Sequence, residues 1–149
     1  MRRATCQSVG SAVAIEQRSK LTITQEREIE MPMGAVDAQS FAREWVKAWN
    51  DHDLEAILSH YTDDVEFHSP RIRTVAGRDA DSIIGKAALH DYWGKALEQA
   101  RDLYFAIDHV FTGSDAVTIV YTNHRQQSVA ETFVFNDAGK VERSIAAYG

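Results

Sequence analysis

Hydrophobic residues recur at helical spacing in three segments of the chain. In residues 37–49 apolar side chains fall every three or four positions, and Asp37 stands where a helix N-cap is expected. A shorter segment of the same kind, residues 54–60, follows Asp53, which can cap it in the same way. The third segment, residues 86–99, follows a glycine. The pattern therefore predicts three helices, of which the first two form a short helical hairpin.

The other hydrophobic positions alternate with polar ones, which is the pattern of half-buried strands. Residues 65–69 form one such run, and Pro70 ends it. Four longer runs come after the third helix, at residues 103–111, 116–124, 128–136 and 141–149. Short polar turns separate them, so they are predicted to form an antiparallel meander. Residues 71–84 are predicted to be a loop with a short strand at residues 74–75. Helices followed by a sheet give an α+β fold.

Length and charge restrict the class of protein. A chain of 149 residues with 44% hydrophobic and 26% charged residues suits one globular domain. The net charge is −6 and the basic residues are scattered, so no nucleic-acid partner and no anionic membrane surface is expected. Apolar runs stay far below the roughly 20 residues that span a bilayer. We therefore predict a protein with neither partner.

The first 36 residues are predicted to be a poorly ordered extension of a domain that covers residues 37–149. They mix polar and charged residues without a sustained period. An over-extended start, a mobile arm or an extra strand are the alternatives. The segment after Arg2 and Arg3 is broken by polar residues and is a weak signal peptide, so a cytoplasmic location is expected. Cys6 is the only cysteine, which excludes an intramolecular disulfide.

Three stretches of the sequence together resemble a known family. They are FAREWVKAWNDHDLEAILSHYTDDVEFHSP, GKAALHDYWGKAL and ETFVFNDAGKVERSIAAYG, in that order and at that spacing. They resemble the SnoaL-like (polyketide-cyclase-like) branch of the nuclear-transport-factor-2-like superfamily, over residues 37–149. The resemblance implies a cone-shaped curved antiparallel sheet wrapped around three N-terminal helices, with a deep apolar pocket. Members of the superfamily include isomerases, dehydratases, epoxide hydrolases, cyclases and non-catalytic binding domains, so the fold does not name a reaction.

Ketosteroid isomerase, a distant relative, can be compared residue by residue. Its helix-one tyrosine falls at Trp45 of this chain, its general base at Ser69 and its protonated sheet acid at Glu131. Only Glu131 keeps a carboxyl group. A serine without a base beside it does not shuttle a proton between carbon atoms at neutral pH. The resemblance therefore does not carry ketosteroid isomerase chemistry to this chain.

The stretch HYTDDVEFHSP concentrates acidic residues and histidines. Asp63 and Asp64 are interpreted as turn residues, because Asx side chains bond to nearby backbone N–H groups between a helix and a strand. Strand alternation directs Glu66 and His68 outward and Phe67 inward. Metal ligands must lie on one face, and the histidines show no ligand spacing. We therefore expect neither a metal nor another cofactor.

Glu131 is the main candidate for catalysis. It shares a strand face with Val129 and Phe133, so it is an acidic group among apolar ones. A general acid or base with a raised pKa is one interpretation, and a hydrogen-bond anchor for a ligand is another. A buried carboxyl paired with a neighbour, or a group at the pocket rim, would have no function of its own. His109 lies an even number of residues after Phe105, so alternation places both on the same strand face. It is a weaker candidate base, and the alternative is a histidine packed in the core or at an interface.

Aromatic residues on the predicted inner faces could line a binding cavity, although plain core packing is the alternative. The predicted ligand-binding residues are Trp45, Trp49, Tyr61, Phe67, Ser69, Trp93, Phe133 and Tyr148. Tyr61 or Tyr148 is expected to donate a hydrogen bond to the carboxyl group of Glu131. His124 and Arg125 are placed at a hairpin turn and are expected to be solvated.

The sequence as a whole predicts a small-molecule pocket protein. Its ligand would be a hydrophobic cyclic compound of polyketide, terpenoid or steroid type. If the protein is an enzyme, it would be a cofactor-independent isomerase, dehydratase, cyclase or hydrolase. The alternative is a non-catalytic ligand-binding or dimerisation module. A homodimer is expected, paired through an apolar outer sheet face that includes Val120, Val134, Ile145 and Ala147.

Overall fold

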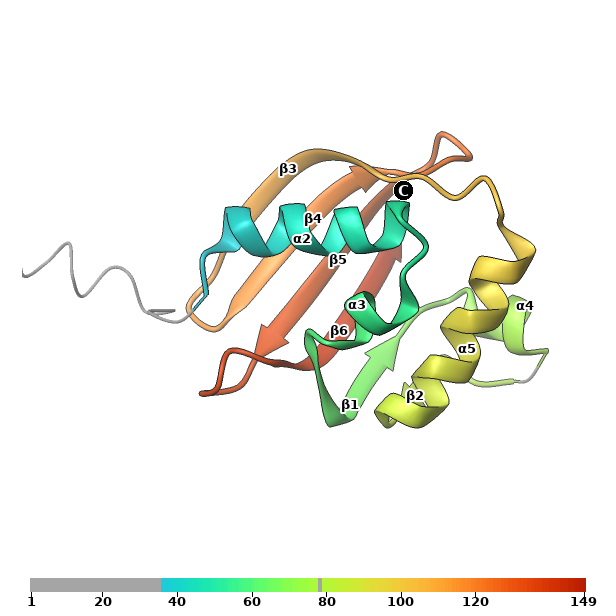
Figure 1. Ribbon diagram of the computed structural model, residues 1–149, viewed down its shortest axis with the longest axis horizontal. Coiled ribbons are helices and arrows are strands. Elements are labelled where there is room, and N and C mark those ends of the chain that lie inside the picture. The colour runs from blue at the N-terminus through green and yellow to red at the C-terminus, as the bar shows by residue number, and fades with distance from the viewer. Residues whose placement is uncertain (1–35, 78) are drawn as a thin grey trace, which may run out of the picture. The chain divides into compact units, whose positions relative to one another are not determined.

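The computed structural model describes residues 36–77 and 79–149 (Figure 1). The expectations for residues 1–35 lie outside the described residues. The helices are α2 (Ala38–Asn50), α3 (Leu54–Leu58), α4 (Ile72–Ala76) and α5 (Lys86–Gln99). The strands are β1 (Tyr61–His68), β2 (Ser82–Ile84), β3 (Ala106–Thr112), β4 (Ala116–Thr122), β5 (Ser128–Phe135) and β6 (Val141–Tyr148).

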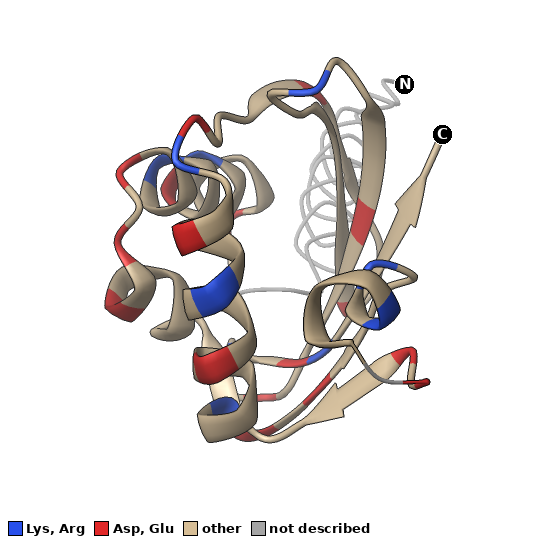
Figure 2. Cartoon of the chain, turned by 90° about the vertical axis from the view of Figure 1, so that its right-hand side faces the viewer, with Lys and Arg blue, Asp and Glu red and all other residues tan. Residues whose placement is uncertain are grey.

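The six strands form one curved sheet in the order β2-β1-β6-β5-β4-β3. Neighbouring strands are antiparallel except β1 and β6, which run parallel. The helices lie on the concave side of this sheet (Figure 2). The predicted α+β class and the antiparallel meander of β3 to β6 are confirmed. The parallel pairing of β1 with β6 was not predicted, because these strands are far apart in the sequence.

The two helices of the predicted hairpin begin at side-chain caps. The Gln39 amide donates to Asp37 Oδ1 over 3.1 Å at the start of α2, and the Ala56 amide donates to Asp53 Oδ1 over 3.1 Å at the start of α3. These bonds satisfy backbone donors that have no partner within a helix. The apolar stripe of α2 then packs on the inner face of the sheet, with the Phe41 and Phe133 rings 5.0 Å apart.

A side-chain clamp holds the end of α2 against the segment that leads into β3. Asn50 Nδ2 donates to the Phe105 carbonyl over 3.0 Å, and the Phe105 amide donates back to Asn50 Oδ1 over 2.7 Å. One amide side chain thereby pairs both backbone polar groups of a residue that is itself buried. The clamp brings Phe105 beside Trp45, where their rings stack at 5.8 Å.

The segment after Pro70 differs from the prediction. Residues 74–75, expected to be a strand, lie in helix α4, where the Val75 amide donates to the Arg71 carbonyl over 3.0 Å. Fully buried Ile72 anchors this turn, and Gly77 ends it with a φ of 65°. Tertiary contact thus overrides the strand preference of β-branched residues. Strand β2 occupies another part of the predicted loop.

The predicted turn at Asp63 and Asp64 is also wrong. Both residues lie within β1, in the stretch where its register against β6 shifts, and both are exposed. Lys86 Nζ lies 3.6 Å from Asp63 Oδ1. The other half of β1 follows the prediction, because Val65 and Phe67 are buried while Glu66 and His68 point away from the core.

Acidic and basic residues are interspersed over the helices, turns and strands rather than gathered on one side (Figure 2). Within residues 36–77 and 79–149, no helix combines the length and the apolar composition that crossing a membrane requires.

Candidate functional site

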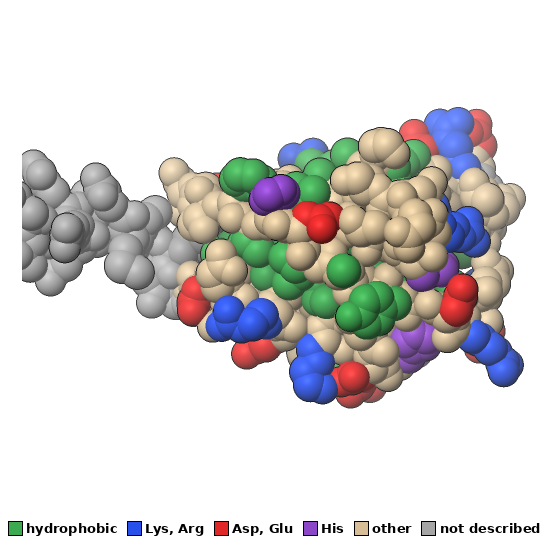
Figure 3. Space-filling view, turned by 90° about the horizontal axis from the view of Figure 1, so that it is seen from above, with side chains coloured by type: hydrophobic (Ala, Val, Ile, Leu, Met, Phe, Trp, Pro, Cys, Tyr) green, Lys and Arg blue, Asp and Glu red, His purple; other side chains and the backbone are tan. Residues whose placement is uncertain are grey.

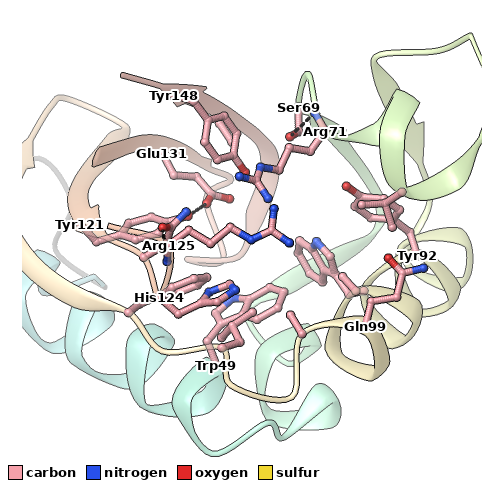
Figure 4. A pocket seen from close by; sticks show the side chains of 18 of the residues that line it. Trp49, Ser69, Arg71, Tyr92, Gln99, Tyr121, His124, Arg125, Glu131 and Tyr148 are labelled. Carbon is pink, nitrogen blue, oxygen red and sulfur yellow. Dashed lines mark hydrogen bonds between the residues drawn. The ribbon is translucent and has the colours of Figure 1, made fainter. Parts of the chain in front are cut away.

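A cavity of about 130 Å³ lies between the helices and the inner face of the sheet (Figure 4). Helices α2 and α5 contribute indole and phenol rings, and β1, β4, β5 and β6 contribute the opposite wall. The apolar part of the lining includes Trp45, Trp49, Phe67, Trp93 and Phe105. The polar part includes Ser69, Arg71, Tyr92, Asn123, His124, Arg125 and Glu131. The cavity is therefore an aromatic chamber with a small set of polar groups, which is the usual composition of a small-molecule site.

Glu131 lies on the inner face of β5, a strand that is paired on both sides. Its neighbours in the register are Ile119 of β4 and Ala146 of β6, both buried. Strand alternation places Glu131 on the same face as Val129 and Phe133, as predicted. Only 4% of the glutamate surface is exposed. A carboxyl group is thus held at the cavity wall by a rigid central strand.

Two hydroxyl groups bind the Glu131 carboxyl group. Ser144 Oγ donates to Oε1 over 2.9 Å, and the Tyr121 hydroxyl donates to Oε2 over 3.2 Å. Burial raises the pKa of Glu131 to about 7, and the bonds from Ser144 and Tyr121 offset only part of this rise. Burial also raises the pKa of Tyr121 well above its usual range, so this phenol remains a donor. The carboxyl group can therefore hold or release a proton near neutral pH.

The expected partners of Glu131 were wrong. Tyr61 instead accepts a hydrogen bond from Trp45 Nε1 over 2.9 Å, inside the core. Tyr148 lies at the mouth of the cavity, where the Arg71 guanidinium stands over its ring at 4.8 Å from the centroid. The strand faces of Tyr121 and Ser144 follow from alternation and turn length. Which hydroxyl reaches the carboxyl group depends on sheet curvature, and the sequence pattern does not contain that information.

The mouth of the cavity is built by the β4–β5 hairpin and the start of α4. Asn123 Oδ1 accepts from the amides of Arg125 over 2.9 Å and Gln127 over 3.1 Å, which holds the hairpin loop. Asn123 Nδ2 donates to Gln127 Oε1 over 3.2 Å, and the Arg71 guanidinium donates to the same oxygen. This network holds the Arg71 side chain and the hairpin backbone, and Arg71 and Arg125 both point into the cavity (Figure 4).

Two nitrogen atoms at the cavity are buried without a partner among the described residues. They are Trp49 Nε1 and His124 Nδ1. The expectation that His124 is solvated was wrong, because only 12% of its side chain is exposed. Arg125 is exposed at the hairpin, as expected, but its guanidinium points inward rather than into solvent. Within the described residues, no three His, Cys, Asp or Glu side chains are grouped so as to hold a metal ion.

A model of the SnoaL-like domain matches residues 42–145, well over half of the chain. The protein belongs to the SnoaL-like family. The resemblance seen in the sequence is thereby confirmed. No curated protein matches the chain.

Solved structures agree with this SnoaL-like assignment. A SnoaL-like protein of unknown function from Burkholderia thailandensis is 40% identical, with a TM-score of 0.72 over 75% of this chain and 93% of that one. RV0760c from Mycobacterium tuberculosis, solved in complex with estradiol-17β-hemisuccinate, is 20% identical, with a TM-score of 0.61 over 75% and 93%. SalBIII, an epoxide hydrolase/cyclase-like enzyme with a role in pyran ring formation in salinomycin, is 16% identical, with a TM-score of 0.57 over 75% and 90%. The last two share the fold.

The SnoaL-like cavity brings together most of the predicted ligand-binding residues. Those that line it are Trp45, Trp49, Phe67, Ser69, Trp93 and Tyr148. Tyr61 and Phe133 do not, because both are packed in the core behind the wall. The ring of Phe133 lies 5.0 Å from that of Trp45, and the ring of Tyr61 lies 5.1 Å from that of Trp93.

His109 lies outside the site. The pairing of β3 with β4 contains an irregularity between Ile107 and His109, so the side-chain alternation shifts by one residue there. His109 is opposite Val120, whose strand neighbours Ile119 and Tyr121 face the core. The histidine is consequently exposed on the outer face of the sheet. Its predicted inward orientation was wrong.

Proposed function

We propose that this SnoaL-like protein binds a hydrophobic cyclic compound in the cavity and transfers a proton to or from it through Glu131. The observation that carries the proposal is a fully buried carboxyl group at the wall of an aromatic chamber, with a pKa of about 7. Both protonation states are populated at neutral pH, which is the condition under which one group serves as acid and base. The reaction class is a cofactor-independent isomerisation, dehydration, cyclisation or hydrolysis.

The ligand class is supported by the lining and by the relatives. Indole and phenyl rings offer flat apolar surface to a ring system. RV0760c has been solved with a steroid ester, and SalBIII is linked to the formation of a pyran ring in a polyether. A polyketide-, terpenoid- or steroid-like compound is the corresponding proposal for this chain.

A non-catalytic binding module would be favoured if aromatic side chains filled the cavity. Trp45 and Trp93 form part of the wall, but Phe133 lies behind it, and the chamber stays open. The buried carboxyl group of Glu131 therefore favours the catalytic alternative.

We also propose that two copies pair through the outer face of the sheet. Val120, Val134, Ile145 and Ala147 alternate with buried residues and so lie on that face, each partly or largely exposed. In the view from above, hydrophobic side chains form several separate groups on the molecule (Figure 3). Pairing of two sheets would cover the outward-facing apolar residues.

Mass spectrometry of the native protein should reveal a co-purified cyclic compound, and Glu131→Gln should separate binding from turnover. The substitution keeps the shape of the side chain and removes the titrating group. With the compound as substrate, we expect activity to fall by roughly 100-fold or more, as for loss of general acid–base catalysis, while the compound still binds. Glu142→Gln, on an exposed residue of β6, is the matched control. Equal turnover by Glu131→Gln and the wild-type protein would rule out the proposed role.

A further inference from the structure

We infer that the mouth of the cavity binds a carboxylate group carried by the ligand, through Arg71 and Arg125. This inference rests on the proposed binding function of the cavity and adds the charge of the ligand. The first observation is the charge of the wall. Its always-cationic side chains are Arg71 and Arg125, and its one carboxyl group is Glu131. A chain of net charge −6 thus presents a wall in which positive charge prevails.

The second observation is that neither arginine is paired with a carboxylate of the described residues. Some of the other basic residues, Lys47, Arg73 and Lys86, do have acidic partners. The guanidinium of Arg73 lies 2.6 Å from Asp81 and 2.9 Å from Asp79. Arg71 and Arg125 have no such ion pair in the part of the chain that the structure describes. A guanidinium keeps five donors in a planar fork, which matches the two oxygens of a carboxylate.

The third observation is how the two guanidinium groups are directed: side-chain contacts hold that of Arg71, and the hairpin backbone positions Arg125. Arg71 donates to Gln127 and stands over the Tyr148 ring, and Arg125 projects from a hairpin closed by Asn123. Both side chains point into the same cavity although they come from different elements (Figure 4). Two like charges directed into one space repel each other, and the attraction of both to an anion placed there would offset that repulsion.

The fourth observation is a pair of buried nitrogen atoms that lack a hydrogen-bond partner in the part of the chain that the structure describes. The indole N–H of Trp49 can only donate, and His124 Nδ1 is a second polar atom in the lining of the same cavity. A buried donor that is left unpaired destabilises the protein. Oxygen atoms of a ligand would satisfy such groups. The acid group of the ligand would lie at the mouth, and its apolar rings would fill the chamber towards Glu131.

The tryptophans of the chain supply the readout. The sequence contains three, and Trp45, Trp49 and Trp93 all line the cavity, so ligand binding should change the intrinsic fluorescence. Estradiol-17β-hemisuccinate and its methyl ester are titrated as one pair of probes, and 3-cyclohexylpropionate and its methyl ester as a smaller pair. Within each pair the rings are identical, and the ester differs from the acid by an added methyl group and the loss of the negative charge. We expect the acid to bind about tenfold or more tightly than its ester.

The ratio of the affinity for the acid to the affinity for the ester should fall to near unity in the double variant Arg71→Gln/Arg125→Gln. Each single variant should lose part of this preference. Arg43→Gln, on the exposed side of α2, removes the same charge elsewhere and should keep the full preference. Thermal unfolding of each variant checks that it is folded. Equal binding of acid and ester by the wild-type protein would overturn the carboxylate inference and leave the binding function intact. No fluorescence change with either member of both pairs would overturn the binding function as well.

Discussion

The Glu131 carboxyl group links the proton concentration to the stability of the fold. Its pKa is about 7 in the folded protein, against an ordinary value of 4.5. Between these two values the folded state binds more protons than the unfolded state, so the free energy of unfolding falls as pH rises. The stabilisation that the protonated Glu131 gives the folded state is fully present below pH 4.5. It is lost as pH rises through the pKa of the folded protein.

The variant Glu131→Gln should lack this pH-dependent contribution to the free energy of unfolding, because it has no carboxyl group at that position. Relative to the variant, we expect the wild-type protein to lose about 3 kcal/mol of unfolding free energy between pH 4.5 and pH 8. Urea unfolding of both proteins at several pH values measures this difference. Glu142→Gln should follow the wild-type curve, since its carboxyl group is exposed. A difference between wild type and Glu131→Gln that is constant with pH would contradict the burial of a titrating group.

The hydrogen bond between Trp45 and Tyr61 offers a test in the core. Tyr61→Phe removes the acceptor and leaves the buried Trp45 N–H unpaired, which should lower the free energy of unfolding by about 1–3 kcal/mol. Tyr104→Phe, at a phenol that is 60% exposed, should change the free energy by less than about 0.5 kcal/mol. Urea unfolding measures both. A cost for Tyr61→Phe as small as that of the control would show that Trp45 finds another partner.

At the scale of whole elements, regular alternation was a reliable guide where a strand is paired without interruption. Glu131 and Val129 were placed correctly on the inner face because β5 keeps its register against β4 throughout. His109 was misplaced because β3 contains an irregularity. That shift depends on pairing with β4, and Thr122 donates to Asp108 Oδ2 over 2.7 Å at this point. The pattern of a single strand does not contain such information.

The cavity mouth was missed for a similar reason. Arg71, His124 and Arg125 stand in segments whose patterns predict only loops and turns. They form part of the site because the hairpin and α4 are joined through the side chain of Gln127. Aromatic residues at helical spacing were easier to predict, because helix periodicity fixes the face on which Trp45 and Trp49 lie.

The Asn50 clamp makes a prediction about how α2 and β3 are held together. Asn50→Ala removes both hydrogen bonds to the Phe105 backbone, and the loss should be about 1–3 kcal/mol of unfolding free energy. Asn50→Asp keeps the acceptor for the Phe105 amide but sets an oxygen against the Phe105 carbonyl in place of the donor, so it should also lower the free energy of unfolding. Urea unfolding measures both variants. An alanine variant as stable as the wild-type protein would show that water replaces the clamp.

For the whole molecule, the proposed sheet-to-sheet dimer can be tested by sedimentation. We expect twice the 16.7 kDa chain mass at micromolar concentration. Ile145→Glu places a charge on the outer face, beside Thr132 and His68 in the register, and should give monomers. Gln39→Glu adds the same charge at an exposed position of α2 and should stay dimeric. A single 16.7 kDa species for the wild-type protein would contradict the dimer.

The position of β6 also bears on how the protein is made. Among the described strands it comes last in chain order, yet it lies in the middle of the sheet, between β1 and β5. Until β6 has been synthesised, the early strands β1 and β2 have no link to the meander, and Glu131 lacks the hydroxyl of Ser144. The nascent chain therefore exposes unpaired strand edges during translation, when such edges are prone to aggregate. Assembly of the sheet and assembly of the chemical site are one event, after translation of β6.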